Sequence, residues 1–275
     1  MEYAICVRCG VQFAARTPPR CPICDEEREA IAAGGQQWTT LAALRADHRN
    51  QVAEIAPGLT TIASEPSFAI GQQAHLIVTP AGNLLWNCIS LIDADTVAAI
   101  TARGGVAAIA ISHPHFYASV IEWSRVFANA PIWLHGDDRA WVMRPDPAIR
   151  FWEGETAAPL PDSGLTLIRC GGHFPGSCVL HWPDGADGGA LLTGDTIQVV
   201  ADRRWVSFMY SYPNLIPLDA ASVNRIVAAV ELVQLAARFV GIDLGDQFLG
   251  HGLEIRLGPG LDAKGTVFLD RASQL

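Results

Sequence analysis

Four side chains that can bind a divalent metal occur in three separate stretches of the sequence. His113 and His115 flank Pro114 at the end of an apolar run, His173 follows two glycines, and Asp195 lies within Thr-Gly-Asp-Thr. Side chains two residues apart in an extended segment point to the same side, so the first two imidazoles can share one ion. With His173 and Asp195 arriving from later turns, the pattern predicts a hydrolytic metal site. The alternative is that two of the eight histidines fall two apart by chance.

A second group of metal-binding side chains lies near the N-terminus. Cys6 and Cys9 form one CxxC pair, and Cys21 and Cys24 form another after eleven intervening residues. Two such pairs can place four thiolates around one zinc ion, which then replaces the core that about 25 residues cannot supply. We therefore predict a structural zinc ribbon over residues 1–30. A redox dithiol is the alternative, and the few nearby arginines favour a folding or docking role over contact with nucleic acid.

The elements that must position these residues follow from hydrophobic patterning. Residues 31–54 are charged and interrupted by two glycines, which predicts a linker or helical arm, and the main domain is expected over 55–275. Short apolar runs predict strands, and apolar residues at helical spacing predict helices. Strands are expected at 59–62, 74–78, 84–86, 106–111, 131–135, 165–169, 179–182 and 190–192, and helices at 94–103 and 219–237. This alternation indicates an α/β or mixed (α+β) layered architecture.

The order of motifs and elements resembles the metallo-β-lactamase-fold hydrolase superfamily. A hairpin at 75–86, a helix, the strand ending in Ser-His-Pro-His, then Gly-Gly-His-Phe-Pro-Gly-Ser and Leu-Leu-Thr-Gly-Asp-Thr match it over roughly 57–245. The resemblance implies a four-layer αβ/βα sandwich with metal at one edge. It also implies that His113, His115 and His173 bind the first metal, and that Asp195 reaches this metal or bridges to a second. The motifs are specific to the fold and not to a substrate.

The sequence departs from the family motif HxHxDH at two positions. Tyr117 stands where the family has Asp, and Ala118 stands where it has the last His. Two ligands of a second metal are therefore missing, which predicts a mononuclear or degenerate site and disfavours a di-iron redox centre. The Tyr117 phenol can donate to a developing oxyanion or leaving group, or simply pack in the core. The family usually has one more histidine ligand after a strand near the end of the domain, and His251 is the candidate for it. The residues before His251 do not have the pattern of a strand that leads into a loop.

The expected chemistry is hydrolysis by metal-activated water. Three imidazoles around zinc, or another divalent metal, leave a fourth place for water, whose pKa falls from about 15.7 to about 7 on coordination. Asp195 can ligate the metal, orient the hydroxide or take its proton. An ester, thioester or lactone carbonyl is the expected target, ahead of a β-lactam or phosphodiester. The alternative is a non-catalytic or weakly catalytic module whose ribbon binds a protein or nucleic acid.

Composition limits the partners and the compartment. The 275 residues carry a net charge of −9, and only 17% of them are charged. Sequence-independent binding to nucleic acid is not expected, because it depends on lysine and arginine side chains that neutralise phosphates. No apolar stretch approaches the roughly 20 residues of a membrane span, and the first residues lack a secretion signal. We expect a cytoplasmic protein acting on a small molecule. The aromatic stretch at 203–212 either folds over the metal, forms an edge hairpin or contacts a second copy in a homodimer.

Overall fold

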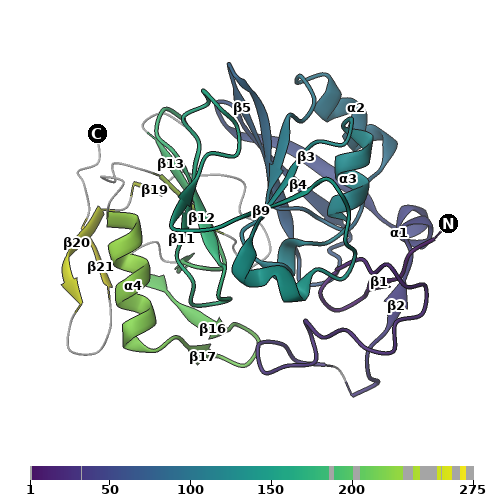
Figure 1. Cartoon of the computed structure of the whole chain (residues 1–275), viewed down its shortest axis with the longest axis horizontal. Helices are drawn as coiled ribbons and strands as arrows, with labels where there is room; N and C mark the ends of the chain where they lie inside the picture. Colours follow the sequence, from purple (N-terminus) through teal and green to yellow (C-terminus); the bar gives the residue numbers. More distant parts are fainter. Residues whose placement is uncertain are drawn as a thin grey trace.

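Two mixed β-sheets stack against each other, and helices cover their outer faces (Figure 1). The computed structural model describes residues 2–31, 33–185, 189–200 and 205–231, together with strands at 238–241, 253–254, 256–261 and 267–270. The helices are α1 (Leu41–Asp47), α2 (Ala94–Thr101), α3 (Val120–Val126) and α4 (Ala220–Glu231), with 3-10 turns η1 (Pro114–Phe116) and η2 (Gly136–Trp141). None of the described helices is long and apolar enough to span a membrane.

The first sheet has seven strands in sequence order, from β3 to β9. The first four strands form an antiparallel meander, and β6 to β9 run parallel, with α2 connecting β6 to β7. Asp93 caps α2, because its side chain accepts the backbone N–H of Thr96 at 2.7 Å. The strands are β3 (Arg49–Ala56), β4 (Leu59–Glu65), β5 (Gln73–Thr79), β6 (Gly82–Trp86), β7 (Ala108–Ala110), β8 (Ile132–His135) and β9 (Ile149–Trp152).

The second sheet has six strands in the order β10-β11-β12-β13-β18-β19. Strands β10 to β13 are antiparallel, and β18 runs parallel to β13. The strands are β10 (Thr156–Ala157), β11 (Thr166–Arg169), β12 (Cys178–Trp182), β13 (Ala190–Gly194), β18 (Arg238–Gly241) and β19 (Leu253–Glu254). Two-stranded pairs complete the described structure: β1 (Ile5–Cys6) with β2 (Trp38–Thr39), β14 (Gln198–Val199) with β15 (Val206–Ser207), β16 (Met209–Ser211) with β17 (Ile216–Pro217), and β20 (Arg256–Leu261) with β21 (Val267–Asp270).

The core lies in three layers that follow from the alternation of side chains along the strands. Leu84 and Trp86 of β6 face the second sheet and pack in one cluster with Leu180 and Leu192, whereas Leu85 faces outward under the helices of the first sheet. On the far side of the second sheet, α4 buries its apolar face against β11 to β13. The observed sandwich confirms the predicted αβ/βα fold, and Figure 1 shows α2 and α3 on one side and α4 on the other.

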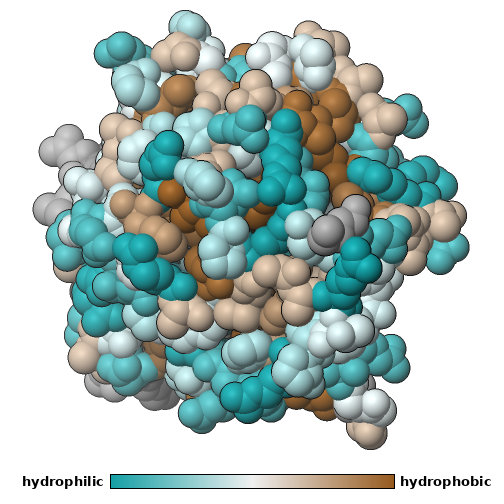
Figure 2. Space-filling view, turned by 45° about the vertical axis from the view of Figure 1, so that its right-hand side comes forward, coloured by the Kyte–Doolittle hydropathy of each residue, from teal (hydrophilic) through white to brown (hydrophobic). Residues whose placement is uncertain are grey.

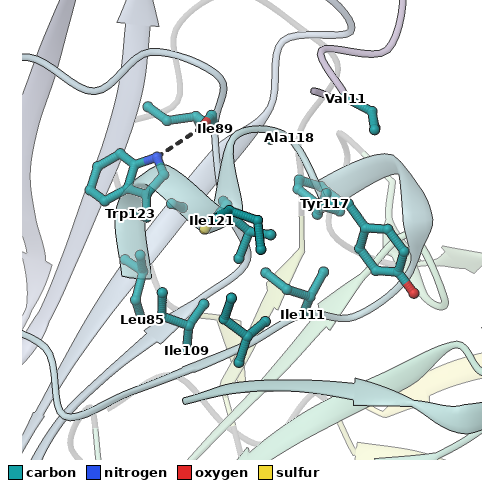
Figure 3. Close-up of a cluster of buried hydrophobic side chains, with 14 of the residues drawn as sticks. Val11, Leu85, Ile89, Ile109, Ile111, Tyr117, Ala118, Ile121 and Trp123 are labelled. Atoms are coloured by element: carbon teal, nitrogen blue, oxygen red, sulfur yellow. Dashed lines mark hydrogen bonds between the residues drawn. The ribbon is translucent and has the colours of Figure 1, made fainter. Parts of the chain in front are cut away.

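The ribbon and the arm that follows it pack directly on the first sheet. Val11 shares a buried cluster with Ala118, Ile121 and Trp123 (Figure 3), and the N–H of Gln12 donates to the carbonyl of Ala118 at 3.0 Å. Helix α1 lies within the arm predicted at 31–54, but β3 already begins at Arg49 and belongs to the seven-stranded sheet. The domain boundary at residue 55 stays a prediction. The face shown in Figure 2 mixes hydrophilic and hydrophobic residues.

Candidate metal centre

Loops at one edge of the sandwich carry the predicted metal-binding side chains. His113 and His115 follow β7, His173 follows β11, and Asp195 follows β13 directly. The first loop is anchored at its start, since the Ser112 N–H donates to the Asn87 side chain at 2.9 Å and the Ser112 carbonyl accepts the Cys178 N–H at 3.0 Å. Strands from both sheets therefore deliver the four side chains to the same place.

Four donor atoms, one from each of these side chains, lie within 4.8 Å of one another. Oδ2 of Asp195 is 3.3 Å from Nε2 of His113, 3.7 Å from Nε2 of His173 and 4.0 Å from Nδ1 of His115. Nε2 of His173 is 3.3 Å from Nδ1 of His115. A tetrahedral zinc with bonds of about 2.0 Å would place such donors roughly 3.3 Å apart. The spacing therefore fits a single divalent ion.

Hydrogen bonds at the opposite nitrogens set which ring atom is free. Nδ1 of His173 donates to the Met209 carbonyl at 3.0 Å, which leaves a lone pair on Nε2. Nδ1 of His113 is 2.9 Å from the Ser112 hydroxyl, and Nε2 of His113 is buried without a hydrogen-bond partner among the described residues. A buried imidazole nitrogen without a partner, aimed at a carboxylate and two other imidazoles, is what a metal ligand requires.

Burial and proximity also adjust the charges of the group toward metal binding. Burial lowers the pKa of His113 and of His173, so both rings are neutral near pH 7. Burial alone would raise the pKa of Asp195, but the His113 imidazole and then the other two hold that pKa well below its ordinary value. The neutral rings of His113 and His173 beside the negatively charged Asp195 carboxylate favour a divalent cation.

A cavity of about 650 Å³ opens onto these side chains. His115, His173 and Asp195 lie in its wall with both polar and apolar neighbours, including Phe68 and Tyr212. The Tyr212 hydroxyl donates to the Asp195 carbonyl at 2.9 Å. The described part of the aromatic stretch at 203–212 thus contributes both to the cavity and, through Met209, to the orientation of His173. A contact with a second copy stays a prediction.

Tyr117 is buried among apolar side chains and is not among the described residues that line this cavity. Its hydroxyl lies 3.5 Å from the Asp138 carbonyl, and burial raises the pKa of the phenol well above its ordinary value. Figure 3 shows Tyr117 and Ala118 in the cluster with Val11. A catalytic role for Tyr117 stays a prediction that this placement does not support. His251 lies outside the described residues.

The four N-terminal cysteines also converge. Sγ of Cys6 is 3.8 Å from Sγ of Cys24, and Sγ of Cys9 is 3.7 Å from Sγ of Cys21. A tetrahedral zinc with Zn–S bonds of about 2.3 Å places its sulfurs roughly 3.8 Å apart. All four side chains are buried, and the donor spacing is that of a zinc ribbon.

The sequence did not predict two residues that lie at the site. Glu29 and Arg8 line the cavity, and Glu29 lies beside His115, with Oε1 3.8 Å from Nε2. Arg8 pairs with Glu29, since Nε lies 2.8 Å from Oε2. The only sequence signal is the acidic run after the second CxxC, which does not indicate where its carboxylates lie.

Comparisons with known proteins agree with the fold. The uncharacterized protein YmaE of Bacillus subtilis (strain 168) is 50% identical over 239 residues, which cover 85% of this chain and 86% of the relative. The structure of VMB-1 superposes with a TM-score of 0.55 at 13% identity, covering 70% of this chain and 88% of that one. The metallo-β-lactamase FIM-1 of Pseudomonas aeruginosa in its mono-zinc form gives 0.53 at 13% identity, covering 70% and 86%. A search of protein-family models found no match.

Proposed function

Because the chain belongs to the family of Bacillus subtilis YmaE and has the metallo-β-lactamase fold, we propose that it is a metal-dependent hydrolase. The observation that supports this proposal is the convergence of Nε2 of His113, Nδ1 of His115, Nε2 of His173 and Oδ2 of Asp195 at one end of the cavity. These side chains would hold zinc or another divalent metal. A bound metal of this kind supplies Lewis acidity and lowers the pKa of water.

The residues around the site are suited to a mononuclear centre. Ala118 has no metal-binding atom, and the Tyr117 hydroxyl lies 3.5 Å from the Asp138 carbonyl and outside the metal cluster. Both residues lie in the core under the ribbon. Asp195 keeps a negative charge beside the three imidazole rings, so it can bind the metal or accept a hydrogen bond from water. His251 remains a candidate for a further ligand.

The proposed substrate is a small molecule with an ester, thioester or lactone carbonyl. The cavity volume of about 650 Å³ is in the range of small-molecule sites, and its wall combines polar and apolar side chains. The net charge of −9 disfavours a nucleic-acid substrate. The alternative function is a non-catalytic protein whose ribbon binds a partner. The contacts between the ribbon and the sandwich disfavour this alternative, because they tie the ribbon to the sandwich.

Metal analysis combined with hydrolysis assays tests the proposal. We expect about two metal ions per chain in the purified protein, and His173→Ala should lose one of them together with hydrolysis of a panel of nitrophenyl esters, thioesters and lactones. His181→Ala is the matched control, because this histidine lies on β12 outside the metal cluster. A wild-type protein that binds metal only at the four cysteines, and loses none in His173→Ala, would overturn the proposal.

A further inference from the structure

Glu29 is a buried carboxylate that reaches the candidate metal centre from a distant part of the sequence. Its side chain is only 3% exposed, and Oε1 lies 3.8 Å from Nε2 of His115. That nitrogen is itself buried and has no hydrogen-bond partner among the described residues. A short side-chain adjustment to about 2.9 Å would make this contact a hydrogen bond.

The other nitrogen of the His115 ring faces the metal-binding atoms. Nδ1 lies 3.3 Å from Nε2 of His173 and 4.0 Å from Oδ2 of Asp195. An imidazole that offers its Nδ1 lone pair to a metal carries its proton on Nε2. The proton of His115 would therefore point at Glu29, and a carboxylate in that position fixes the tautomer and the ring orientation of a metal-binding histidine.

The ribbon holds Glu29 from one side, and the loop after β11 together with strand β16 holds it from the other. Arg8, between the first two cysteines, donates from Nε to Oε2 of Glu29 at 2.8 Å, which leaves Oε1 for His115. The preceding Arg28 donates to the His173 carbonyl at 2.7 Å, and its guanidinium lies 4.4 Å from the ring centre of Phe174. The Ser211 hydroxyl donates to the Arg28 carbonyl at 3.0 Å.

A second link joins the ribbon to the same histidine. The buried side-chain amide of Gln72 donates to the carbonyl of Cys9 at 2.7 Å and also to the carbonyl of His115. The backbone of His115 and the ring of His115 are thus each connected to the ribbon, one through Gln72 and the other through Glu29 and Arg8.

We propose that Glu29 is a positioning residue that holds His115 for metal binding, and that the N-terminal ribbon thereby supports the hydrolase site. This inference rests on the proposed function, because it assumes a metal between His113, His115 and His173. It gives the ribbon a role in the site beyond its own folding: the ribbon delivers a carboxylate to a histidine encoded far along the chain.

The test measures metal affinity at the hydrolase site rather than turnover. Protein with zinc in the ribbon and Co²⁺ in the hydrolase site is titrated with a chelator, and the Co²⁺ absorption spectrum reports the geometry. We expect Glu29→Ala to weaken Co²⁺ binding by about 10- to 100-fold and to alter the spectrum. Glu29→Gln should recover part of the loss, because its amide oxygen still accepts a hydrogen bond. Glu27→Gln, at an exposed position in the same segment, should match the wild type.

Arg8 provides an independent arm of the test. Arg8→Ala should weaken Co²⁺ binding less than Glu29→Ala does, and the double variant should bind no more weakly than Glu29→Ala, because both changes remove the same contact. Arg20→Ala, which breaks the exposed pair with Asp25, is the control. Co²⁺ affinity in Glu29→Ala within about twofold of the wild type would overturn the inference. A wild type that binds no Co²⁺ outside the ribbon would instead overturn the proposed function.

Discussion

The hydroxyl of Ser112 is the partner that orients His113. It lies 2.9 Å from Nδ1 of that ring, in the residue just before it, and so directs Nε2 toward Asp195. Partners of this kind raise metal affinity because they fix the ring before the metal arrives. The same logic applies to the Met209 carbonyl at His173.

Replacing Ser112 by alanine should therefore weaken the hydrolase metal site without unfolding the protein. We expect a loss of about 10-fold in metal affinity, measured by chelator competition. Ser119→Ala is a matched control, because Ser119 is equally buried but its hydroxyl has no hydrogen-bond partner among the described residues. Equal affinities of the two variants would show that the Ser112 hydroxyl does not orient His113.

At the scale of single residues, the sequence indicates the four candidate metal-binding side chains but not the groups around them. Each of the four side chains belongs to a short motif that follows a strand-like apolar run, and such motifs are visible in the sequence: His113, His115, His173 and Asp195. Glu29 lies in no such motif, and its approach to His115 depends on how the end of the ribbon packs beside the cavity. A contact of this kind is tertiary and has no local signal.

Among the elements, η2 connects the first sheet to the loop that carries His173. Oδ1 of Asp138 in η2 accepts the N–H of Gly176 at 2.8 Å. Burial raises the pKa of Asp138 to about 7, so the folded protein holds this proton well above the pH at which the unfolded chain releases it. Protonation of one carboxyl group is thus linked to folding.

Asp138 should make the free energy of unfolding depend on pH. Its pKa is raised on folding, so its contribution is fully present below about pH 4 and is lost as the pH rises to about 7. Asp138→Asn cannot ionise and keeps an oxygen for the Gly176 N–H. The variant should therefore gain stability over the wild type between pH 5 and pH 8, by up to ~4 kcal/mol.

Denaturant unfolding at several pH values measures this difference. Asp162→Asn, an exposed position, is the control and should follow the wild type. A stability difference between Asp138→Asn and the wild type that stays constant from pH 5 to pH 8 would contradict the assignment of the raised pKa to this carboxyl group.

The elements that sequence patterning predicts best are those buried on one face or on both. Strand β6 alternates between two buried clusters, and α4 presents Val223, Ile226 and Val230 to the core at helical spacing. Strand β3 was not predicted, because it is an edge strand whose residues are half-buried or exposed and include several polar side chains. Residues 232–237 of the predicted long helix lie outside the described part of the chain.

For the whole molecule, the ribbon and the sandwich share a single buried cluster. Val11 and the four cysteines pack in the same cluster as Ile121 and Trp123, and the Ser90 hydroxyl donates to the Gly10 carbonyl at 2.7 Å. The side chain of Arg144 donates to that of Glu122 at 2.6 Å and also to that of Gln12. The ribbon therefore covers apolar surface that would otherwise meet water.

Loss of the ribbon metal should for this reason destabilise the whole protein and not the ribbon alone. Cys21→Ser removes one sulfur ligand, and the remaining buried thiols cannot replace the free energy of metal binding. We expect one cooperative calorimetric transition whose midpoint is lower by ~10 °C or more. The reason is that unfolding of the ribbon would expose the hydrophobic cluster that the ribbon and the sandwich share. Cys170→Ser is the control, since Cys170 lies outside the ribbon and a serine can still donate to the Ile168 carbonyl. A second transition that stays at the wild-type temperature would show that the sandwich folds independently of the ribbon.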